Sequence, residues 1–395
     1  MTDGGPAGDL RIAVWRRLMS DDHAELRQRA AETDPTDPAA IMRLRRLFDA
    51  DVVSAALDLA KAREKARRKM PDIADAIVAD PAGVEMASST GSARWKAARF
   101  AQRAGGAPVF DVCCGIGGDA IELVRAGLDV AAIEIDPLRA WMAERNAGCE
   151  VLTGDTAQTK VPTDAFIHVD PSRRDDAGRR RLRLEDMTPP PDVVRNVIER
   201  AQGSAVKLAP GVDPRRLAPG ESEFISERGR LTQAVLWTGA LAECETYHRA
   251  TMLPGRETIA GAPMSAPTTP HEDAWLFTTD PALERARLVG HLARRHGLRA
   301  LDNPATGLLT GPDRIDDPWV TAYRRIERMP WNLKRVRTWL AARNAGIVTV
   351  KTRGGAVDPD RVASALRGPG DTPLVVFVQR IGRRVEALVC DVPGP

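Results

Sequence analysis

A glycine-rich turn preceded by an acid is the part of this sequence best suited to ligand chemistry. It reads Asp111-Val-Cys-Cys-Gly115-Ile-Gly117-Gly118-Asp119 and joins a short apolar run to a helical pattern. Glycines at such a junction let the backbone approach a ligand at a helix N-terminus, where unpaired N–H groups point outward. The turn is weak evidence when taken alone, because tight strand-to-helix turns need glycine for structural reasons as well.

Three more acids follow later apolar runs, each at a point where a strand is expected to end. Glu134 comes 19 residues after Gly115, Asp155 follows Gly154, and Asp170 begins the segment Asp-Pro-Ser-Arg-Arg. Ligands of open α/β sheets bind at the carboxyl ends of the strands, so we expect these positions to meet in one crevice. A single acid would more simply cap the next helix, but four acids in register favour a shared site.

The chemistry of the turn distinguishes two kinds of nucleotide cofactor. A dinucleotide-binding dehydrogenase would also use a glycine turn and an acid such as Glu134 for the ribose hydroxyls, but typically within the pattern GxGxxG. Here the turn is GxGG followed by Asp119. Asp111 would repel a pyrophosphate, whereas it would attract the ammonium of an amino-acid moiety. The residues therefore favour S-adenosylmethionine (SAM), which has such an amine and no phosphate.

Short apolar runs alternate with helical patterns in the middle of the chain. The expected strands are 108–113, 129–135, 149–152, 165–169, 205–208, 223–226 and 233–238, and the expected helices are 119–126, 137–146 and 191–202. Short strands separated by helices are typical of a parallel sheet with both faces covered. We therefore predict an α/β fold with a Rossmann-like, doubly wound domain.

Two further regions flank this domain. Residues 1–95 are predicted to be helical, with Asp37 as an N-cap before Pro38 and with Pro71 ending a second helix. The stretch 261–270 is rich in proline, alanine and threonine and is the best linker candidate. We expect an N-terminal helical region at 1–95, the doubly wound domain at 96–262 and a small C-terminal α/β domain at 270–395.

The C-terminal domain has the pattern of both helices and strands. We expect one helix over 280–296 and another over 332–343, and strands over 347–351, 374–379 and 385–390. Such a mixture fits a small α/β domain.

Composition and cysteine usage indicate a soluble protein from a reducing compartment. Hydrophobic residues make up 43% of the chain and charged residues 28%, and no run approaches the roughly 20 apolar residues of a membrane span. The N-terminus, MTDGGPAGDL, does not have the basic and then apolar character of a secretory signal. Five scattered cysteines without a CxxC pair disfavour disulfides and a cysteine-bound zinc. We therefore expect a cytoplasmic protein with no membrane contact and no metal.

Taken together, these motifs resemble the class I SAM-dependent methyltransferases. The resemblance rests on DVCCGIGGDA, AAIEIDP, ERNA, GD and DPSRR, which cover about 105–210. It is greatest to the branch that includes trimethylguanosine synthase, and more closely to bacterial methyltransferases with a C-terminal THUMP-like domain. The C-terminal resemblance is carried by the segments MPWNLKRVRTWL at 329–340 and KTRG at 351–354.

The resemblance implies a role for each residue of the cofactor site. Asp111 and the turn from Gly115 to Gly117 would hold the methionine part of SAM. Glu134 would bind the ribose, and Asp155 would bind the adenine amine.

The fourth motif, Asp170-Pro171-Ser172-Arg173, bears on the methyl acceptor. Related enzymes that methylate exocyclic amines of bases carry Asp/Asn-Pro-Pro-aromatic, in which the side-chain oxygen and a proline carbonyl accept hydrogen bonds and the aromatic ring stacks on the base. Asp170 and Pro171 match that pattern, whereas Ser172 and Arg173 depart from it. An arginine plane can also stack on a base, so Asp170, Pro171 and Arg173 are the expected catalytic residues.

Two basic segments suggest RNA as the partner. Residues 61–69 contain six basic side chains and one acid, and residues 173–183 contain six arginines and two aspartates. Such segments can bind phosphates, although a solvated helix face and a solvated loop are the simpler interpretations. The expected activity is methylation of a nitrogen of an RNA base in tRNA or rRNA.

Other functions stay open at this stage. The chain would also suit a methyltransferase acting on protein or a small molecule, or a non-catalytic protein that binds SAM and RNA. Methylation of a pyrimidine C5 is disfavoured, because that chemistry uses a cysteine nucleophile near the fourth motif and none is present. His168 lies within an apolar run and is expected to be a core or edge residue rather than a base.

Overall fold

The computed structural model describes residues 6–172, 183–301, 308–353, 355–381 and 384–392. The chain forms two compact units, one made of Met1–Ser222 with Gln233–Glu245 and the other of Glu223–Thr232 with Thr246–Pro395. This division groups the residues differently from the three regions expected from the sequence, whose borders remain predictions.

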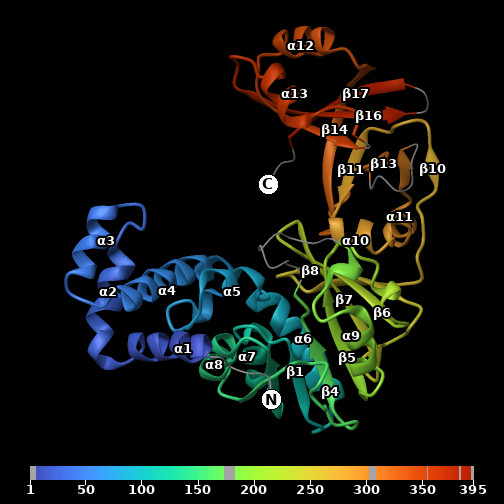
Figure 1. The fold of residues 1–395 in the computed structure, drawn as a ribbon. Coiled ribbons are helices and arrows are strands. Elements are labelled where there is room, and N and C mark those ends of the chain that lie inside the picture. Colours follow the sequence, from blue (N-terminus) through green and yellow to red (C-terminus); the bar gives the residue numbers. More distant parts are fainter. Residues whose placement is uncertain (1–5, 173–182, 302–307, 354, 382–383, 393–395) are drawn as a thin grey trace. The chain divides into compact units, whose positions relative to one another are not determined.

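The first unit begins with six helices. They are α1 (Pro6–Leu18), α2 (Ala24–Glu32), α3 (Pro38–Arg45), α4 (Ala50–Lys69), α5 (Pro81–Met86) and α6 (Thr90–Arg103), as Figure 1 shows. The Asp37 side chain accepts from the Ala39 amide, and Pro38 occupies the first helical position, so α3 begins where the sequence indicated. Leu18, Leu26 and Leu59 are among the buried side chains that pack α1, α2 and α4 together.

The same unit contains a doubly wound sheet. Its strands are β1 (Val109–Val112), β2 (Val130–Glu134), β3 (Glu150–Thr153), β4 (Phe166–Val169), β5 (Gly203–Leu208) and β7 (Arg230–Gly239), in the order β3-β2-β1-β4-β5-β7. The first five strands are parallel, and β7 runs antiparallel to β5. Its helices are α7 (Gly118–Arg125), α8 (Pro137–Ala147) and α9 (Pro191–Ile198). The Rossmann-like α/β fold predicted from the alternating pattern is confirmed.

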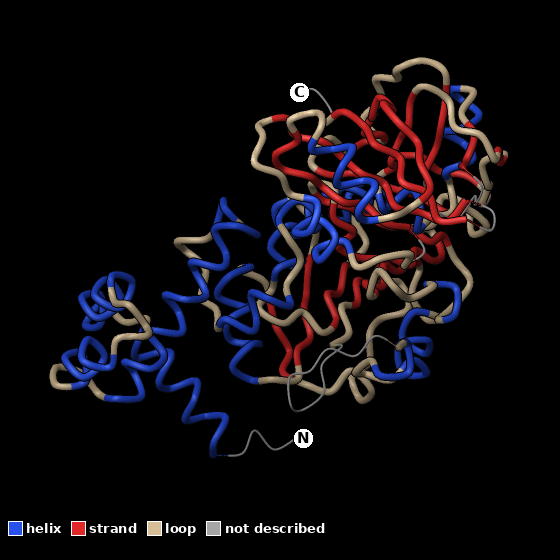
Figure 2. The backbone as a smooth tube through the Cα atoms, turned by 90° about the horizontal axis from the view of Figure 1, so that it is seen from above, coloured by secondary structure: helices blue, strands red, loops and turns tan. Residues whose placement is uncertain are grey.

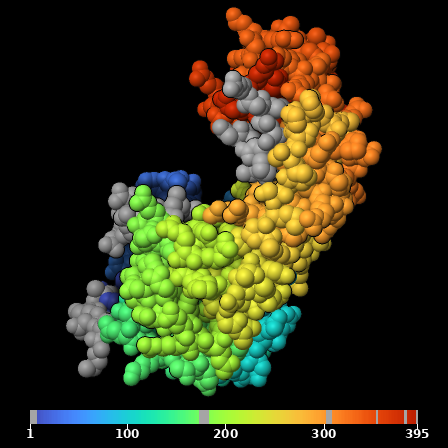
Figure 3. Space-filling view, turned by 90° about the vertical axis from the view of Figure 1, so that its right-hand side faces the viewer, coloured from blue at the N-terminus to red at the C-terminus, as the bar shows by residue number. Residues whose placement is uncertain are grey.

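The second unit is mainly antiparallel. It contains most of β6 (Glu221–Glu227) and the antiparallel pair β8 (His248–Leu253) and β9 (Glu257–Gly261). A further sheet has the order β10-β12-β13-β11-β14-β17-β16-β15. Its strands are β10 (Thr268–Thr269), β11 (Trp275–Thr279), β12 (Arg299–Leu301), β13 (Leu308–Gly311), β14 (Val320–Pro330), β15 (Ala345–Arg353), β16 (Thr372–Ile381) and β17 (Arg384–Asp391). The strands are red in Figure 2, and Figure 3 shows one face of this unit in yellow to red.

Helices α12 (Leu333–Ala341) and α13 (Pro359–Leu366) pack on β15 and β16 through a shared core. The three C-terminal strands expected from the sequence lie within β15, β16 and β17. The single helix expected over 280–296 is wrong, because the chain forms α10 (Pro281–Arg285) and α11 (Val289–His296) instead. Arg287 has φ +59°, and this left-handed backbone ends the first helix and redirects the chain.

Candidate active site

Strand register brings the predicted residues to one edge of the parallel sheet. Val112 at the end of β1 pairs with Ile133 of β2 and with Val169 of β4. Glu134 and Asp170 come directly after these partners, so they lie on either side of the start of the glycine turn. This is the edge of the sheet at which the sequence placed a common site.

The backbone of the glycine turn is left-handed at three positions, the first of which is Cys113 with φ +60°. Gly115 has φ +59° and Gly117 has φ +84°, a region that side chains other than glycine rarely adopt. A Cβ on Gly117 would lie 3.1 Å from the Cα of Ala143 in α8, so that glycine permits close packing. A Cβ on Gly115 would meet nothing within 4 Å among the described residues, which leaves open space beside the turn.

Glu134 is tied to the turn by its side chain. Its Oε2 accepts a hydrogen bond from the Gly115 amide at 2.8 Å, and its Oε1 accepts one from the Asp136 amide at 3.0 Å. Burial raises the pKa of Glu134, and the two amide donors act against that rise. The carboxylate therefore fixes the turn and the start of α8 at once.

Asp111 is completely buried within β1. Its Oδ1 lies 2.7 Å from Nδ1 of His168 on the neighbouring strand. Its Oδ2 is buried and has no hydrogen-bond partner in the part of the chain that the structure describes. Burial raises the pKa of Asp111, while His168 opposes the rise. An unpartnered carboxylate oxygen in this place can accept a hydrogen bond from a cationic ligand.

Below the turn lies a buried ionic cluster, made of Ser88, Lys96, Asp111, Asp119 and His168. Lys96 Nζ lies 2.6 Å from Asp119 Oδ1, 3.0 Å from His168 Nε2 and 3.1 Å from Ser88 Oγ. An ammonium group only donates, so His168 Nε2 accepts and its Nδ1–H donates to Asp111. His168 is therefore an oriented core residue, as its place in an apolar run indicated.

The charges in this cluster offset the cost of burial. Burial alone would raise the pKa of Asp119, but the charge of Lys96 and its hydrogen bond hold it below its ordinary value. Ser88 and Lys96 come from the region of α5 and α6, outside any motif, and sequence reasoning missed both. Nothing in their spacing relates them to the glycine turn.

The carboxylate of Asp170 forms an ion pair that the sequence did not suggest. Its Oδ2 lies 2.6 Å from Nζ of Lys207 on β5, and the Asp170 amide donates to the Val112 carbonyl at 3.1 Å. Lys207 Nζ also donates to the Met86 carbonyl at 3.2 Å. The sequence offered one indication that Lys207 belongs to the site, namely that it is a lysine within an apolar run.

Ser172, at the end of the fourth motif, pairs with Thr188 further along the chain. Pro171 is buried, while Ser172 is exposed and exchanges two backbone hydrogen bonds with Thr188, at 2.8 and 2.9 Å. Arg173 and the arginines at 174 and 179–181 lie outside the described residues, so their expected roles remain predictions. Arg183 is exposed.

Asp155 is half-buried two residues after β3. Its Oδ1 accepts from the Ala157 amide at 2.9 Å, and its backbone carbonyl accepts from the amides of Gln158 and Thr159. The side chain thus caps a turn at the same edge of the sheet as Glu134.

Cys113 and Cys114 are packed within the turn. Burial raises the pKa of the Cys113 thiol to about 12 and raises that of Cys114 well above its ordinary value. Both side chains are therefore uncharged thiols at neutral pH, which does not suit a nucleophile.

Most basic side chains of the segment 61–69, at the end of α4, already have partners within the first unit. Arg67 lies 3.0 Å from Asp75, Lys65 lies 3.6 Å from Glu85, and Arg63 and Lys69 donate to backbone carbonyls. Lys61 and Arg68 form no hydrogen bond or ion pair with another described residue.

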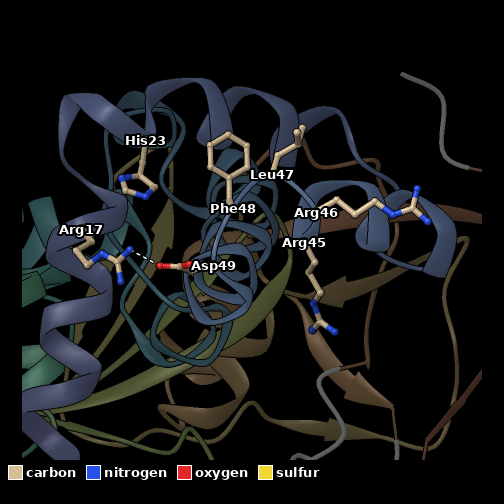
Figure 4. Close-up of a pocket in the computed structure, with 7 residues that line it drawn as sticks. All are labelled: Arg17, His23, Arg45, Arg46, Leu47, Phe48 and Asp49. Atoms are coloured by element: carbon tan, nitrogen blue, oxygen red, sulfur yellow. Dashed lines mark hydrogen bonds and ion pairs between the residues drawn. The ribbon is translucent and has the colours of Figure 1, made fainter.

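A hollow of about 390 Å³ lies in the N-terminal helices, as Figure 4 shows. It is lined by Arg17, His23, Arg45, Arg46, Leu47, Phe48 and Asp49, and Arg17 pairs with Asp49. The side chains of Arg45 and Arg46 point away from that pair (Figure 4). None of the predicted site residues lines this hollow, so it is separate from the site at the sheet edge.

Within the described residues, no helix has the length and apolar character needed to span a membrane. The same part of the chain contains no group of three or more His, Cys, Asp or Glu side chains placed to hold a metal.

Comparison with known proteins identifies the class. Residues 320–392 match the THUMP domain-like family. Proteins from two Mycobacterium tuberculosis strains, H37Rv and CDC 1551, are described as uncharacterized S-adenosylmethionine-dependent methyltransferases. Each is 32% identical over 321 residues, which is 78% of this chain and 87% of theirs. This chain therefore belongs to the SAM-dependent methyltransferases.

It is accordingly an enzyme whose methyl donor is SAM, with a THUMP-like C-terminal segment. A solved structure from Porphyromonas gingivalis W83, described as a candidate methyltransferase, has the same fold. The TM-score is 0.69 at 17% identity, and the match covers 97% of this chain and 98% of that one.

Proposed function

We propose that this enzyme methylates a nitrogen of an RNA base, in tRNA or rRNA. The observation that carries this proposal is the place of Asp170-Pro171, directly after β4 and beside the glycine turn. A carboxylate and a proline carbonyl at this point suit the hydrogens of an exocyclic amine.

The residues around the turn fit SAM. The unpartnered Oδ2 of Asp111 would accept from its ammonium, and the open space beside Gly115 would admit its methionine part. Each oxygen of Glu134 accepts one amide hydrogen bond, and a carboxylate has about four acceptor positions, so capacity remains for the ribose hydroxyls. Asp155, at the same edge, would bind the adenine amine.

Methyl transfer needs little acid–base help from this protein. Bound SAM supplies a methyl group already activated by its sulfonium. The protein would contribute position: Asp170 and the Pro171 carbonyl align the lone pair of the acceptor nitrogen, and Arg173 stacks on the base. We also propose that this enzyme belongs to the branch of methyltransferases that includes trimethylguanosine synthase.

RNA would be held through the basic side chains that remain available. Lys61 and Arg68 fit this role within 61–69, together with the arginines of 173–183 and the C-terminal THUMP-like domain. A cytoplasmic location, where tRNA and rRNA are accessible, agrees with this partner.

Tritiated SAM offered to total RNA, total protein and small-molecule extract tests the proposal. Label in RNA, released with a methylated base on digestion, is the expected result. Label found in protein or in small molecules instead would show that the substrate belongs to that class and not to RNA. Binding of SAM with no transfer to any fraction would contradict the proposed activity.

A further inference from the structure

We propose that Lys207 is a positioning residue for methyl transfer, which acts by holding one oxygen of Asp170 so that the other stays available to the substrate. This inference rests on the proposed role of Asp170 as the acceptor of the substrate's hydrogen bond. Lys207 lies outside the motifs identified in the sequence.

The register of the sheet places the two residues level with each other. Val169 of β4 pairs with Val206 of β5, so Asp170 and Lys207 are the next residues on neighbouring strands. Nζ of Lys207 lies 2.6 Å from Oδ2 of Asp170, a short charge-assisted hydrogen bond. Asp170 and Lys207 therefore form one unit at the carboxyl edge of the sheet.

The ammonium is fixed from two sides. Nζ also donates to the carbonyl of Met86 at 3.2 Å, at the end of α5. The side chain of Lys207 is 5% exposed, whereas that of Asp170 is 19% exposed. Lys207 is thus held inside the protein while Asp170 is partly exposed at the sheet edge, so Lys207 would act through Asp170 rather than on the substrate.

Stability alone does not account for a lysine at this position. Every residue of β5 is buried, and a buried ion pair contributes no more to stability than well-packed apolar residues often do. The acid that Lys207 pairs with is the proposed acceptor residue of the fourth motif. A pair of this kind orients a carboxylate, as partners of functional side chains commonly do.

The consequence for the reaction is geometric. With Oδ2 bound to Lys207, the Asp170 carboxylate has one orientation, and Oδ1 is left to accept a hydrogen from the acceptor amine. No proton moves between Lys207 and Asp170 in this arrangement. Losing the ammonium would let the carboxylate rotate, and the acceptor lone pair would be aligned less often.

The test compares full-length Lys207→Met, Lys207→Arg and Asp170→Asn with the double variant Lys207→Met/Asp170→Asn, and uses Lys160→Met as a control. Lys160 is exposed and lies outside the segments proposed to bind RNA, so its variant removes a lysine charge elsewhere. Turnover is measured with whichever fraction accepts tritium from the wild type, and SAM affinity is measured by calorimetry.

We expect Lys207→Met to lower kcat by about 10²-fold and to leave SAM affinity within a few-fold. Lys207→Arg should recover part of the loss, because a guanidinium also donates to two acceptors. In the Asp170→Asn background, Lys207→Met should cost little more, since both changes remove the same interaction. If Lys207→Met does not fold, Lys207→Gln, which keeps a donor without the charge, takes its place.

Three results would overturn the role of Lys207: near-normal turnover in Lys207→Met, losses that add fully in the double variant, or a fall in SAM affinity as large as the fall in kcat. RNA methylation that persists in Lys207→Met would refute this inference and leave the proposed function intact. Transfer to protein or small molecules that depends on Lys207 would refute the proposed substrate and leave the inference standing. A wild type without any transfer would refute both.

Discussion

Gly115 and Glu134 are joined by a 2.8 Å hydrogen bond from the amide of the glycine turn to the carboxylate at the end of the neighbouring strand. Two strand ends are thereby locked together at the point where the cofactor is proposed to bind. The glycine turn and Glu134, the acid proposed to bind the ribose, are separate motifs in the sequence and form a single structural unit.

Replacing Glu134 by alanine should weaken binding of SAM and of its demethylated product. The variant loses the proposed acceptor for the ribose hydroxyls and also the partner of the Gly115 amide. A hydrogen bond to a charged group contributes about 1.5–3 kcal/mol, so we expect roughly a 10- to 100-fold loss of affinity by calorimetry. Glu150→Ala, at an exposed position of β3, is the matched control. Unchanged affinity, or tighter binding of NAD than of SAM, would argue against this site.

Lys96→Met should destabilise the protein through the buried ionic cluster. It leaves the Asp119 carboxylate buried without its main cation, a change that typically costs about 3–5 kcal/mol. Chemical unfolding of the variant and of Lys160→Met, which removes an exposed lysine, measures the difference. Equal stability of the two variants would mean that the cluster contributes nothing.

The same variant should respond to pH in a defined direction. In the wild type the pKa of Asp119 is lowered, so its stabilising effect is complete above the ordinary carboxyl pKa and is lost only as the pH falls through the lower folded value. Without Lys96, burial should raise the pKa of Asp119 instead. A buried carboxyl with a raised pKa destabilises the folded protein most at neutral pH, where it is charged in the unfolded chain. The stability deficit of Lys96→Met should therefore shrink from about pH 7 to about pH 4.5. A deficit that grows toward acid would contradict the assigned charges.

The expected turnover loss at Asp170 is best tested with asparagine rather than alanine. Asp170→Ala would leave the buried Lys207 ammonium without its carboxylate, so the melting temperature should fall together with activity. Asp170→Asn keeps an oxygen near Lys207 and should separate the two effects. Thermal unfolding should show a larger drop for the alanine variant, and a wild-type melting temperature in both variants would indicate that the ion pair is not formed.

Arg173 can be tested by the chemistry of its replacement. A stacking partner contributes about 1–3 kcal/mol per base, so Arg173→Ala should first reduce affinity for the acceptor. Arg173→Tyr should recover part of that affinity if Arg173 stacks on a base. If Arg173→Lys rescues and Arg173→Tyr does no better than alanine, the residue binds a phosphate instead.

RNA affinity should fall steeply with salt if the available basic side chains bind phosphates. Each phosphate contact that is lost should lower the log–log slope by roughly 0.7–0.9. Replacing the arginines at 179–181 by alanine, or Lys61 and Arg68 together, should therefore flatten the slope. Arg67→Ala is the control, because Arg67 already pairs with Asp75. RNA affinity that does not change with salt, or no binding to RNA, would contradict the proposal that these side chains bind phosphates.

The sequence predicted the features that depend on local pattern. The alternation of apolar runs and helical stretches predicted the parallel sheet. The position of Glu134 and Asp170 at the ends of predicted strands indicated that both lie at one edge of that sheet. The broken helix at 280–296 was missed because the periodicity continues through Arg287, while the backbone there turns left-handed.

The interactions that support the site were not predictable from spacing. Lys96 reaches Asp119 and His168 from a helix that precedes the glycine turn in the chain, and Lys207 reaches Asp170 from the next strand. Both are buried lysines whose partners become neighbours only when the sheet and helices pack. A single sequence shows the unusual residue in an apolar run but does not show which acid it meets.

The most direct test of the central claim compares wild type and Asp170→Asn in transfer from tritiated SAM to RNA, with the labelled nucleosides identified after digestion. Asp164→Asn, at an exposed position before β4, serves as the control. We predict that the wild type and Asp164→Asn yield a nucleoside methylated on a base nitrogen. Asp170→Asn should bind SAM within a few-fold of normal and transfer at least about 10²-fold more slowly, because its single oxygen would be held by Lys207 and its amide nitrogen cannot accept from the substrate. Label on ribose, label confined to protein or small molecules, or normal transfer by Asp170→Asn would contradict the account.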